Sequence, residues 1–285
     1  MKNKFFYFAI AILLIFFAYF SYQIIVEAKP LQIVFLDVGQ GDSILIQKRT
    51  KQILIDGGPN GKTELAELGK YLPYFDREIE VVIATHPDRD HIGGLVDVAK
   101  NYKIGKVLTT GAEKDTVVFK EWKDIREYDR IETLEAILGD EVEMDGAKLK
   151  IVSPNSAVDP ATGDANNKSV VARLDWGNNS FLFTGDIESP AEREILASGE
   201  NVDVDFLKIA HHGSKYSSSD EFLDATSPGA AIISVAAKNS YGHPTEAVLN
   251  SLKSRNIEIL RTDEKGDIIF ECKAPNEKCK ATTQN

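Results

Sequence analysis

The sequence predicts one α/β domain of two packed β-sheets with helices on the outside, preceded by a hydrophobic N-terminal segment. Three observations support this. Short runs of β-branched and aromatic residues alternate with helical stretches in two successive halves of the chain. No low-complexity linker or short-period repeat separates the halves. An uncharged apolar stretch precedes the first of the runs. Alternating strands and helices of this kind are typical of layered α/β folds.

The N-terminal segment is long enough to cross a membrane. Phe5–Phe20 has no charged or strongly polar residue, and the apolar character continues to Val26. A helix of this length would span about 33 Å, against a bilayer core of about 30 Å. Lys2 and Lys4 precede it, which favours a cytoplasmic N-terminus and an exported remainder. We expect a membrane anchor with an extracytoplasmic domain; the alternative is a signal peptide cleaved after Ala28 and a secreted domain.

The remainder of the chain, residues 30–285, is expected to form the folded domain. Without residues 1–29 the chain loses three Lys and one Glu, which leaves a net charge of −13. This charge weighs against tight, non-specific binding to nucleic acid, although a local basic groove stays compatible with it. Cys272 and Cys279 could close a small loop in an oxidising compartment, and no His lies near them to complete a zinc site.

In the first half, 31–47 (LQIVFLDVGQGDSILIQ) predicts two strands around a turn at Gly39–Gly41, and QILIDGG predicts a third strand. Residues 63–73 look helical and end at a Pro. The β-branched run VVIAT, at 81–85, is typical of a strand buried on both faces. The segment HPDRDH follows it directly, and a Gly pair then leads into a helix near 95–102.

The second half begins after an acidic stretch, 113–146, that we expect to be helical with a solvated face. The predicted strands that follow are LKIVSP, SVVARLDWG, SFLFTGD, DFLKIAHHGS, AAIISVAA, IEIL and GDIIFEC. Helices are expected at 188–198 and 245–254. The order predicts a second sheet with its own outer helices.

Four polar clusters each follow a hydrophobic strand: HPDRDH (86–91), TGD (184–186), HHGS (211–214) and YGHP (241–244). All five His of the chain lie in them. Sites in α/β folds form at strand ends, so we expect these loops to converge. His and Asp are ligands for divalent ions such as Zn²⁺ and Mn²⁺.

A short loop cannot place the four candidate ligands of HPDRDH on one ion without strain, which suggests two neighbouring ions. Asp186 could bridge these ions, because a carboxylate has two oxygens, and His243 would complete the second site. Taken singly, each residue has an ordinary structural explanation; a Gly-Asp pair, for example, commonly caps a turn or helix. The joint pattern favours a metal centre.

The segments THPDRDHIGG, FLFTGD, HHGS and YGHP, in this order and spacing, resemble the metallo-β-lactamase superfamily. More narrowly they resemble the C-terminal hydrolase domain of ComEC-type competence proteins, which FLDVGQGDSILI and ILIDGG also match. The similarity covers about residues 31–271. It implies an αββα sandwich with a two-metal site between the sheets, and a His211 that contacts the scissile phosphate or leaving group. The implied metal ligands are His86, Asp88, Asp90, His91, Asp186 and His243.

Two departures from the superfamily pattern concern the metal site. Asp88 stands where the first motif usually has His, and no His occurs between His91 and His211 to serve as a further ligand. Asn166 and Asn167 lie in that neighbourhood and could donate an amide oxygen at most. One of the two sites is therefore expected to be rich in oxygen ligands and weak, and to accept Mn²⁺ at least as well as Zn²⁺.

The leading functional hypothesis is a metal-dependent phosphodiesterase or nuclease acting on DNA or a related extracytoplasmic polymer. Asp90 is expected to orient the attacking water and His211 to protonate the leaving oxygen. His212 is expected to support the site from outside the ligand set, and Ser214, Lys215, Tyr241 and Asn167 are candidates for substrate contact or support.

Two alternatives stay open. Hydrolysis of small or cell-wall-linked phosphate esters, as in phosphorylcholine esterases, suits the acidic composition better. A non-catalytic domain with one structural ion would explain the missing His ligand. The sequence identifies no protein partner.

Overall fold

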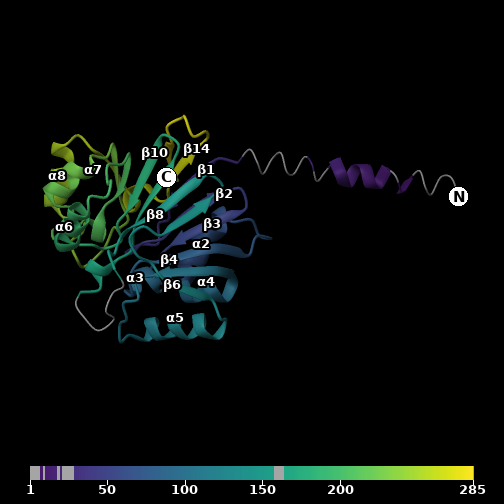
Figure 1. Ribbon diagram of the computed structural model, residues 1–285, viewed down its shortest axis with the longest axis horizontal. Helices are drawn as coiled ribbons and strands as arrows, with labels where there is room; N and C mark the ends of the chain where they lie inside the picture. Colours follow the sequence, from purple (N-terminus) through teal and green to yellow (C-terminus); the bar gives the residue numbers. More distant parts are fainter. Residues whose placement is uncertain (1–6, 9, 18–19, 21–28, 157–163, 285) are drawn as a thin grey trace.

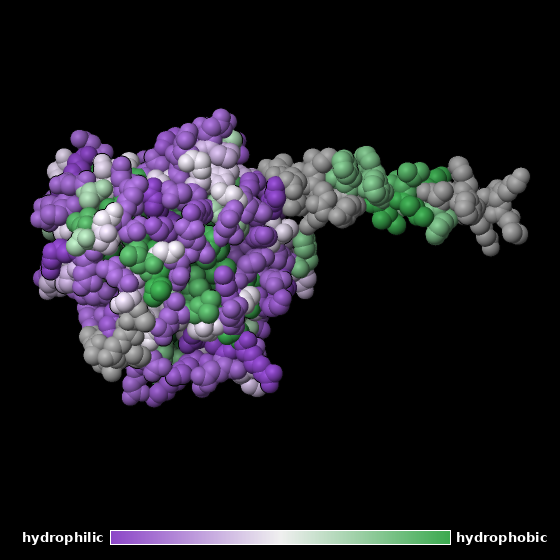
Figure 2. Space-filling view, viewed as in Figure 1, coloured by the Kyte–Doolittle hydropathy of each residue, from purple (hydrophilic) through white to green (hydrophobic). Residues whose placement is uncertain are grey.

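The structure is a computed structural model, and it describes residues 7–8, 10–17, 20, 29–156 and 164–284. Within these ranges, none of the helices combines the length and the apolar character needed to cross a bilayer. Residues 10–17 are helical, and their apolar side chains are exposed (Figure 2). The predicted anchor falls largely outside the described residues and stays a prediction.

Two β-sheets form the centre of the fold (Figure 1). The first has the strand order β15-β14-β1-β2-β3-β4-β5-β6. Its strands are β1 (Leu31–Phe35), β2 (Ile44–Lys48), β3 (Lys51–Ile55), β4 (Glu78–Ala84), β5 (Lys103–Thr109), β6 (Glu132–Glu135), β14 (Ile268–Cys272) and β15 (Lys280–Thr283). The second has the order β13-β12-β11-β10-β9-β8-β7. Its strands are β7 (Glu141–Met144), β8 (Ala147–Ser153), β9 (Val171–Trp176), β10 (Asn179–Phe183), β11 (Phe206–Lys208), β12 (Ala230–Ile233) and β13 (Glu258–Arg261).

The helices form two outer groups, one for each half of the chain. The first group is α2 (Gly61–Tyr71), α3 (Arg89–Ile92), α4 (Leu95–Asn101) and α5 (Val117–Tyr128). The second is α6 (Ser189–Ser198), α7 (Asp220–Thr226), α8 (Glu246–Ser254) and α9 (Thr262–Lys265). Figure 1 shows α6, α7 and α8 together on one side of the strands, and α4 and α5 on another side.

The apolar residues divide into three layers, as the alternation of side chains along a strand requires. In β10, Phe181 and Phe183 belong to the core between the sheets, whereas Leu182 belongs to the core beneath the second group of helices. In β1, Phe35 joins the central core, with its ring centroid 6.1 Å from that of Phe183, and Val34 joins the core under the first group of helices. The predicted αββα sandwich is confirmed.

Strand direction determines where a site can form. β3, β4, β5 and β6 are mutually parallel, and so are β10, β11, β12 and β13. The carboxyl ends of parallel strands lie at one edge of a sheet, where ligands bind in α/β folds. The loops after β4, β10, β11 and β12 carry the four polar clusters of the sequence.

Most elements follow the sequence pattern, and one stretch does not. The expected helices at 63–73, 95–102, 188–198 and 245–254 are confirmed as α2, α4, α6 and α8. The helical prediction for 113–146 is right for α5 and wrong for β6 and β7. Gly139 and Gly146 have φ of +94° and +84°, which interrupts any helix there. Between them Val142 and Met144 are buried and alternate with exposed Glu, a period of two that indicates a strand.

Cys272, the last residue of β14, is joined to Cys279 by a disulfide. The structure therefore contains the small loop, residues 272–279, that the sequence allowed the two cysteines to close.

Candidate metal centre and active site

Residues from all four polar clusters meet at one pocket. Asp88 follows β4, Asp186 follows β10, His212 follows β11, and His243 follows β12 further along the chain. The pocket has a volume of about 100 Å³ and is lined by Gln40, Asp88, Asp90, Asn166, Asp186, His211, His212, Tyr241 and His243. The structure therefore brings the loops together at the carboxyl ends of the strands.

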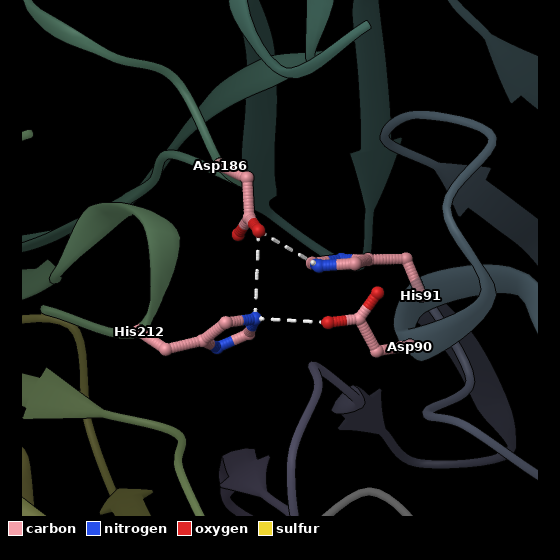
Figure 3. A group of neighbouring side chains, drawn as sticks. All are labelled: Asp90, His91, Asp186 and His212. Atoms are coloured by element: carbon pink, nitrogen blue, oxygen red, sulfur yellow. Dashed lines mark ion pairs between the residues drawn. The ribbon is translucent and has the colours of Figure 1, made fainter. Parts of the chain in front are cut away.

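Four side chains at the base of this pocket form a group that could hold a metal ion: Asp90, His91, Asp186 and His212 (Figure 3). One ligand atom from each lies within 4.8 Å of the other three. Asp186 Oδ2 is 3.3 Å from His91 Nε2 and 3.4 Å from His212 Nε2, and His212 Nε2 is 3.5 Å from Asp90 Oδ2. The group draws two ligands from each half of the chain, so the site exists only when the two sheets are packed together.

The two imidazole rings of this group are held by their Nδ1 atoms. His212 Nδ1 is 2.8 Å from the carbonyl oxygen of Ser234, which can only accept, so Nδ1 carries the proton. His91 Nδ1 is 2.7 Å from Asp56 Oδ2, an arrangement in which the carboxylate accepts from Nδ1. Nε2 is therefore the ring nitrogen of each that is left for a metal ion, once its proton is displaced. Metal-bound His residues usually have this support from a carbonyl or carboxylate.

Several candidate ligand atoms make no hydrogen bond within the described structure. His86 Nε2, His91 Nε2, His212 Nε2 and Asp186 Oδ1 are buried and make no hydrogen bond. Buried polar atoms are rarely left unpaired without a reason, and a bound ion is one such reason. Two nitrogen and two carboxylate ligands also match the preferences of Zn²⁺ and Mn²⁺. The residues present therefore fit a divalent metal ion.

The charges of the group depend strongly on one another. Burial by itself would raise the pKa of Asp186, but the neighbouring His212 and His91 lower it well below its usual range. Burial by itself would lower the pKa of His91, but Asp186 and Asp56 raise it well above its usual range. Burial by itself would also lower the pKa of His212, but its neighbours, chiefly Asp186, raise it above its usual value. These imidazoles therefore hold protons that a metal ion would displace.

His86 and Asp88 lie at the side of the group. The ring centroid of His86 is 4.1 Å from that of His91, and His86 Nδ1 lies 3.0 Å from Thr85 Oγ1. Burial and the charge of His91 lower the pKa of His86 to about 4, so its ring is neutral and its Nε2 can bind a metal. Asp88 Oδ1 accepts a hydrogen bond from Lys114 Nζ at 2.6 Å. Asp88 thus faces the pocket but is already paired with a cation.

His211 and His243 lie on the wall of the pocket, with ring centroids 5.6 Å apart. His211 Nε2 is 3.9 Å from Asp186 Oδ2, and its Nδ1 is 3.3 Å from Glu188 Oε1. The ring of Tyr241 is stacked on His243 at 5.7 Å and is largely exposed. These three rings form the mouth of the site, where a substrate would enter.

The structure groups His212 with three of the predicted ligands and leaves His243 outside that group, while the metal roles of both residues stay a prediction. The sequence places His243 in the ligand set and His212 in a supporting position. In the structure His212 is one of the four grouped residues, and His243 belongs to neither of the two possible ligand groups found among the described residues. His211 and His212 both adopt left-handed backbone angles, with φ of +49° and +53°, and their ring planes are 74° apart. Adjacent rings therefore point in different directions, and only that of His212 enters the group.

The other candidates for substrate contact have mainly structural partners. Asn167 Oδ1 accepts hydrogen bonds from the backbone N–H groups of Glu188 and Ala191 at the start of α6. Ser214 is buried, and its Oγ accepts from the backbone N–H of Tyr216. Lys215 lies over the ring of Tyr216, with Nζ 5.0 Å from the centroid. Asn166, rather than Asn167, lines the pocket.

The sequence analysis missed three charged residues that are 0 to 1% exposed beside the site: Asp42, Asp56 and Lys208. Asp56 accepts from the N–H and the hydroxyl of Thr85 at 2.8 and 2.7 Å while it holds His91. Asp42, Asp56 and His91 make up the second possible ligand group. A signal was present, since Asp42 and Asp56 each stand beside a strand in a Gly-rich turn.

Lys208 is the last residue of β11, and its side chain extends to Asp42 and Asp186 beside the site. Its Nζ makes a short ion pair with Asp42 Oδ2, donates to the carbonyl of Gly185 at 3.1 Å and lies 3.8 Å from Asp186 Oδ1. Burial by itself would lower the pKa of Lys208, but Asp42 and Asp186 raise it above its usual value. The site therefore contains one permanent buried cation. A lysine within an apolar strand gives no sign of this in the sequence.

Comparisons with known proteins agree with this geometry. A family model described as the metallo-beta-lactamase superfamily matches residues 36–237. ComE operon protein 3 of Bacillus subtilis is 32% identical, over 84% of this chain and 32% of that protein. Competence protein ComA of Neisseria gonorrhoeae is 30% identical, over 82% of this chain and 31% of that protein. The chain thus spans about a third of the length of these relatives.

Among solved structures, the metallo-beta-lactamase fold protein YhfI of Bacillus subtilis is similar in fold. Its TM-score is 0.57 at 14% sequence identity, and the match covers 85% of this chain and 100% of that one. The family match includes the strands and loops that supply all four grouped ligands. The chain belongs to the metallo-beta-lactamase superfamily, as a hydrolase whose His and Asp side chains are positioned to bind metal ions.

Proposed function

We propose that this chain hydrolyses phosphodiester bonds with the help of divalent ions, and that its substrate is DNA. The observation that carries the proposal is the group of Asp90, His91, Asp186 and His212, whose imidazole Nε2 atoms make no hydrogen bond and face the carboxylates of the group beside the pocket. These four residues would hold a divalent ion, which would lower the pKa of a water and stabilise negative charge on a phosphoryl oxygen. The name of one curated relative, competence protein ComA, refers to competence, the uptake of DNA, which favours DNA as the substrate.

The protein's own groups are arranged for the rest of the chemistry. Asp90 is both a ligand and a pocket-lining carboxylate, so it can orient a water by accepting its hydrogen bond. His211 is partly exposed on the wall and is held on its Nδ1 side by Glu188, so it can give a proton to the departing oxygen. Tyr241 presents an exposed ring at the mouth, where a base or other flat group of the substrate can rest.

We further propose that the centre takes two ions, Zn²⁺ or Mn²⁺, of which one binds weakly. The four grouped residues would hold the tighter ion. The second would be held by His86 Nε2, Asp88 and the free Oδ1 of Asp186. Its ligand set lacks a further His, and Asp88 is already paired with Lys114. Both features reduce the affinity of that position for a divalent ion.

The experiment uses the full chain, purified in detergent and loaded with Mn²⁺ or Zn²⁺. It measures hydrolysis of linear duplex DNA, of a single-stranded oligonucleotide and of bis-p-nitrophenyl phosphate, with and without EDTA. We expect cleavage of all three that EDTA abolishes. The variant Asp186→Asn should be inactive, and Asp205→Asn, which changes a carboxylate paired with Lys278 outside the pocket, should be active. Metal-loaded protein that leaves every substrate intact would refute the proposal.

A second candidate function is the hydrolysis of small or cell-wall-linked phosphate esters. The volume of the pocket, about 100 Å³, and the chain's net charge of −11 favour a small substrate over a polyanion. Addition of p-nitrophenyl phosphorylcholine to the same assay separates the two candidates. Rapid turnover of this ester with both DNA substrates intact would select the small-ester function.

The location of the domain is also a proposal: anchored in the membrane by the N-terminal segment and facing out of the cytoplasm. The large apolar side chains of the helical residues 10–17 are exposed, with Leu13, Ile15 and Phe17 at 67, 69 and 72%. The disulfide between Cys272 and Cys279 suits an oxidising compartment. Alkaline phosphatase fused after residue 285 should be active in intact cells, and carbonate should leave the protein in membranes. Release by carbonate would favour the secreted alternative.

A further inference from the structure

The second possible ligand group, formed by Asp42, Asp56 and His91, lies directly behind the first group and shares His91 with it. All three side chains are buried. Asp42 Oδ1 has no hydrogen-bond partner, although the residue is only 1% exposed. Two buried carboxylates so close to Asp186 concentrate negative charge that the fold must neutralise.

Lys208 supplies a cation at this place. Its ammonium pairs with Asp42 Oδ2, donates to the carbonyl of Gly185 and lies 3.8 Å from Asp186 Oδ1. It is therefore between a carboxylate of the second group and a carboxylate of the first. The oxygen of Asp42 that Lys208 binds, Oδ2, is also 3.8 Å from His91 Nδ1 in the second group. A divalent ion in that group would therefore lie beside the ammonium of Lys208, and the two cations would repel each other strongly at such distances.

The geometry points to Lys208 as the resident cation of the second ligand group, which keeps a divalent ion out of that group and positions Asp42 and Asp186 beside the metal centre. This inference rests on the proposed function in one respect: it takes the first group to be the site that binds a metal ion. Asp56 then holds His91 and Thr85 and no metal ion, and Oδ1 of Asp42 faces His212 Nδ1 at 3.6 Å. Lys208 is a positioning residue in this arrangement, since it does not itself line the pocket and acts through Asp42 and Asp186.

The test counts metal ions on the full chain. Wild type and Lys208→Ala are stripped with EDTA and dialysed against Mn²⁺. Bound ions are then counted by mass spectrometry, and spin-coupled pairs are detected by electron paramagnetic resonance. Removal of the ammonium frees Asp42 and leaves space for a hydrated ion, so we expect Lys208→Ala to bind about one more Mn²⁺ per chain. The double variant Asp42→Asn/Lys208→Ala should lose the additional ion, because a ligand is gone.

Asp42→Asn alone gives a second measurement that does not depend on the stability of Lys208→Ala. It leaves the ammonium of Lys208 without its carboxylate and beside Asp186. The affinity of the first group for Mn²⁺, measured by calorimetry, should then fall about tenfold or more, because a buried charge within 4 Å acts against the incoming ion. Asp267→Asn is the matched control, since this buried Asp binds Tyr71 and Lys70 instead of a site residue.

The outcomes separate the two proposals. Equal ion counts in wild type and Lys208→Ala, an additional ion that persists in the double variant, or an unchanged affinity in Asp42→Asn would overturn the role of Lys208. A wild type that binds no Mn²⁺ while Lys208→Ala binds one would support that role and refute the proposed metal centre. Absence of binding by both would refute both.

Discussion

Asp56 shows how a residue outside the ligand set can control a ligand. It is fully buried, and its two oxygens accept from Thr85 and from His91 Nδ1. The contact with His91 fixes the ring and directs Nε2 towards Asp186. At the scale of single residues, metal binding therefore depends on the residues that hold each ligand in its orientation as well as on the ligands themselves.

We expect Asp56→Asn to weaken metal binding by about 10- to 100-fold. The amide keeps the size of the carboxylate, but its NH₂ group would face His91 Nδ1–H or the hydroxyl of Thr85, which disturbs the tautomer that exposes Nε2. Titration calorimetry with Mn²⁺ measures the effect. Asp267→Asn should bind Mn²⁺ like wild type, and equal affinities for all three proteins would show that the contact with Asp56 is dispensable.

Glu64 makes stability depend on pH. It is fully buried in α2, where Oε1 accepts from Ser43 Oγ at 2.9 Å and Oε2 has no partner. Burial raises the pKa of Glu64 from 4.5 to about 8. Between these values the folded state binds more protons than the unfolded state, so the free energy of unfolding falls as pH rises. The contribution is complete below pH 4.5 and lost above about pH 8.

We therefore expect Glu64→Gln, which carries no charge at any pH, to flatten this dependence. In EDTA, urea unfolding of wild type should show a lower free energy at pH 8.5 than at pH 5, by up to about 4 kcal/mol at 1.36 kcal/mol per pKa unit. The variant should lose much less over the same range. Parallel pH profiles for the two proteins would contradict a buried, protonated Glu64.

At the scale of elements, the turn between β1 and β2 supports the short helix α3 that carries Asp90 and His91. Gly41 in this turn has φ of +136°, and the N–H of the next residue, Asp42, donates to the carbonyl of Asp90 at 3.2 Å. A Cβ on Gly41 would lie 2.1 Å from that carbonyl oxygen. The glycine is required for close contact between two backbones, in addition to its positive φ.

Gly39 provides a matched control for this contact. It also has a positive φ, +82°, but a Cβ there would meet nothing within 4 Å. Gly39→Ala should cost about 1–2 kcal/mol of stability through the left-handed backbone alone. Gly41→Ala should cost more and also weaken Mn²⁺ binding, because α3 must move. Urea unfolding and calorimetry measure the two effects, and equal behaviour of both variants would argue against support of α3 by the turn.

At the scale of the whole molecule, the metal group joins the two halves of the sandwich. Asp90 and His91 follow β4 in the first sheet, whereas Asp186 and His212 follow β10 and β11 in the second. An ion bound by all four would therefore link the sheets at the edge where the site opens, and the folded state alone would bind it.

We expect saturating metal to raise the melting temperature. An ion at 100 times its Kd adds about 2.7 kcal/mol, which corresponds to about 5–10 °C for a domain of this size. Differential scanning calorimetry of EDTA-treated and Mn²⁺-loaded protein checks this. Asp186→Asn should show little of the increase, and an equal increase in that variant would place the bound ion elsewhere.

Much of the fold could be predicted from the sequence, because it depends on local periodicity and on apolar runs. The run at 81–85 is buried on both faces in β4, and the helices α2, α4, α6 and α8 lie where they were expected. The acidic stretch at 113–146 misled the prediction, since an edge strand with alternate exposed Glu residues resembles a solvated helix in composition. The four polar clusters could be identified as a site from the sequence because each of them follows a predicted strand.

The sequence by itself determined the sandwich, the family and the loops that carry the chemistry, since spacing along the chain encodes strand ends. Only the tertiary structure decided which side chains meet there. His211 and His212 are adjacent in sequence, yet their left-handed backbone sends one ring to the pocket wall and the other into the ligand group. Lys208 and Asp42 form an ion pair across the two sheets that no local pattern encodes. Side-chain direction and long-range pairing depend on how the sheets pack, and that is a property of the folded chain.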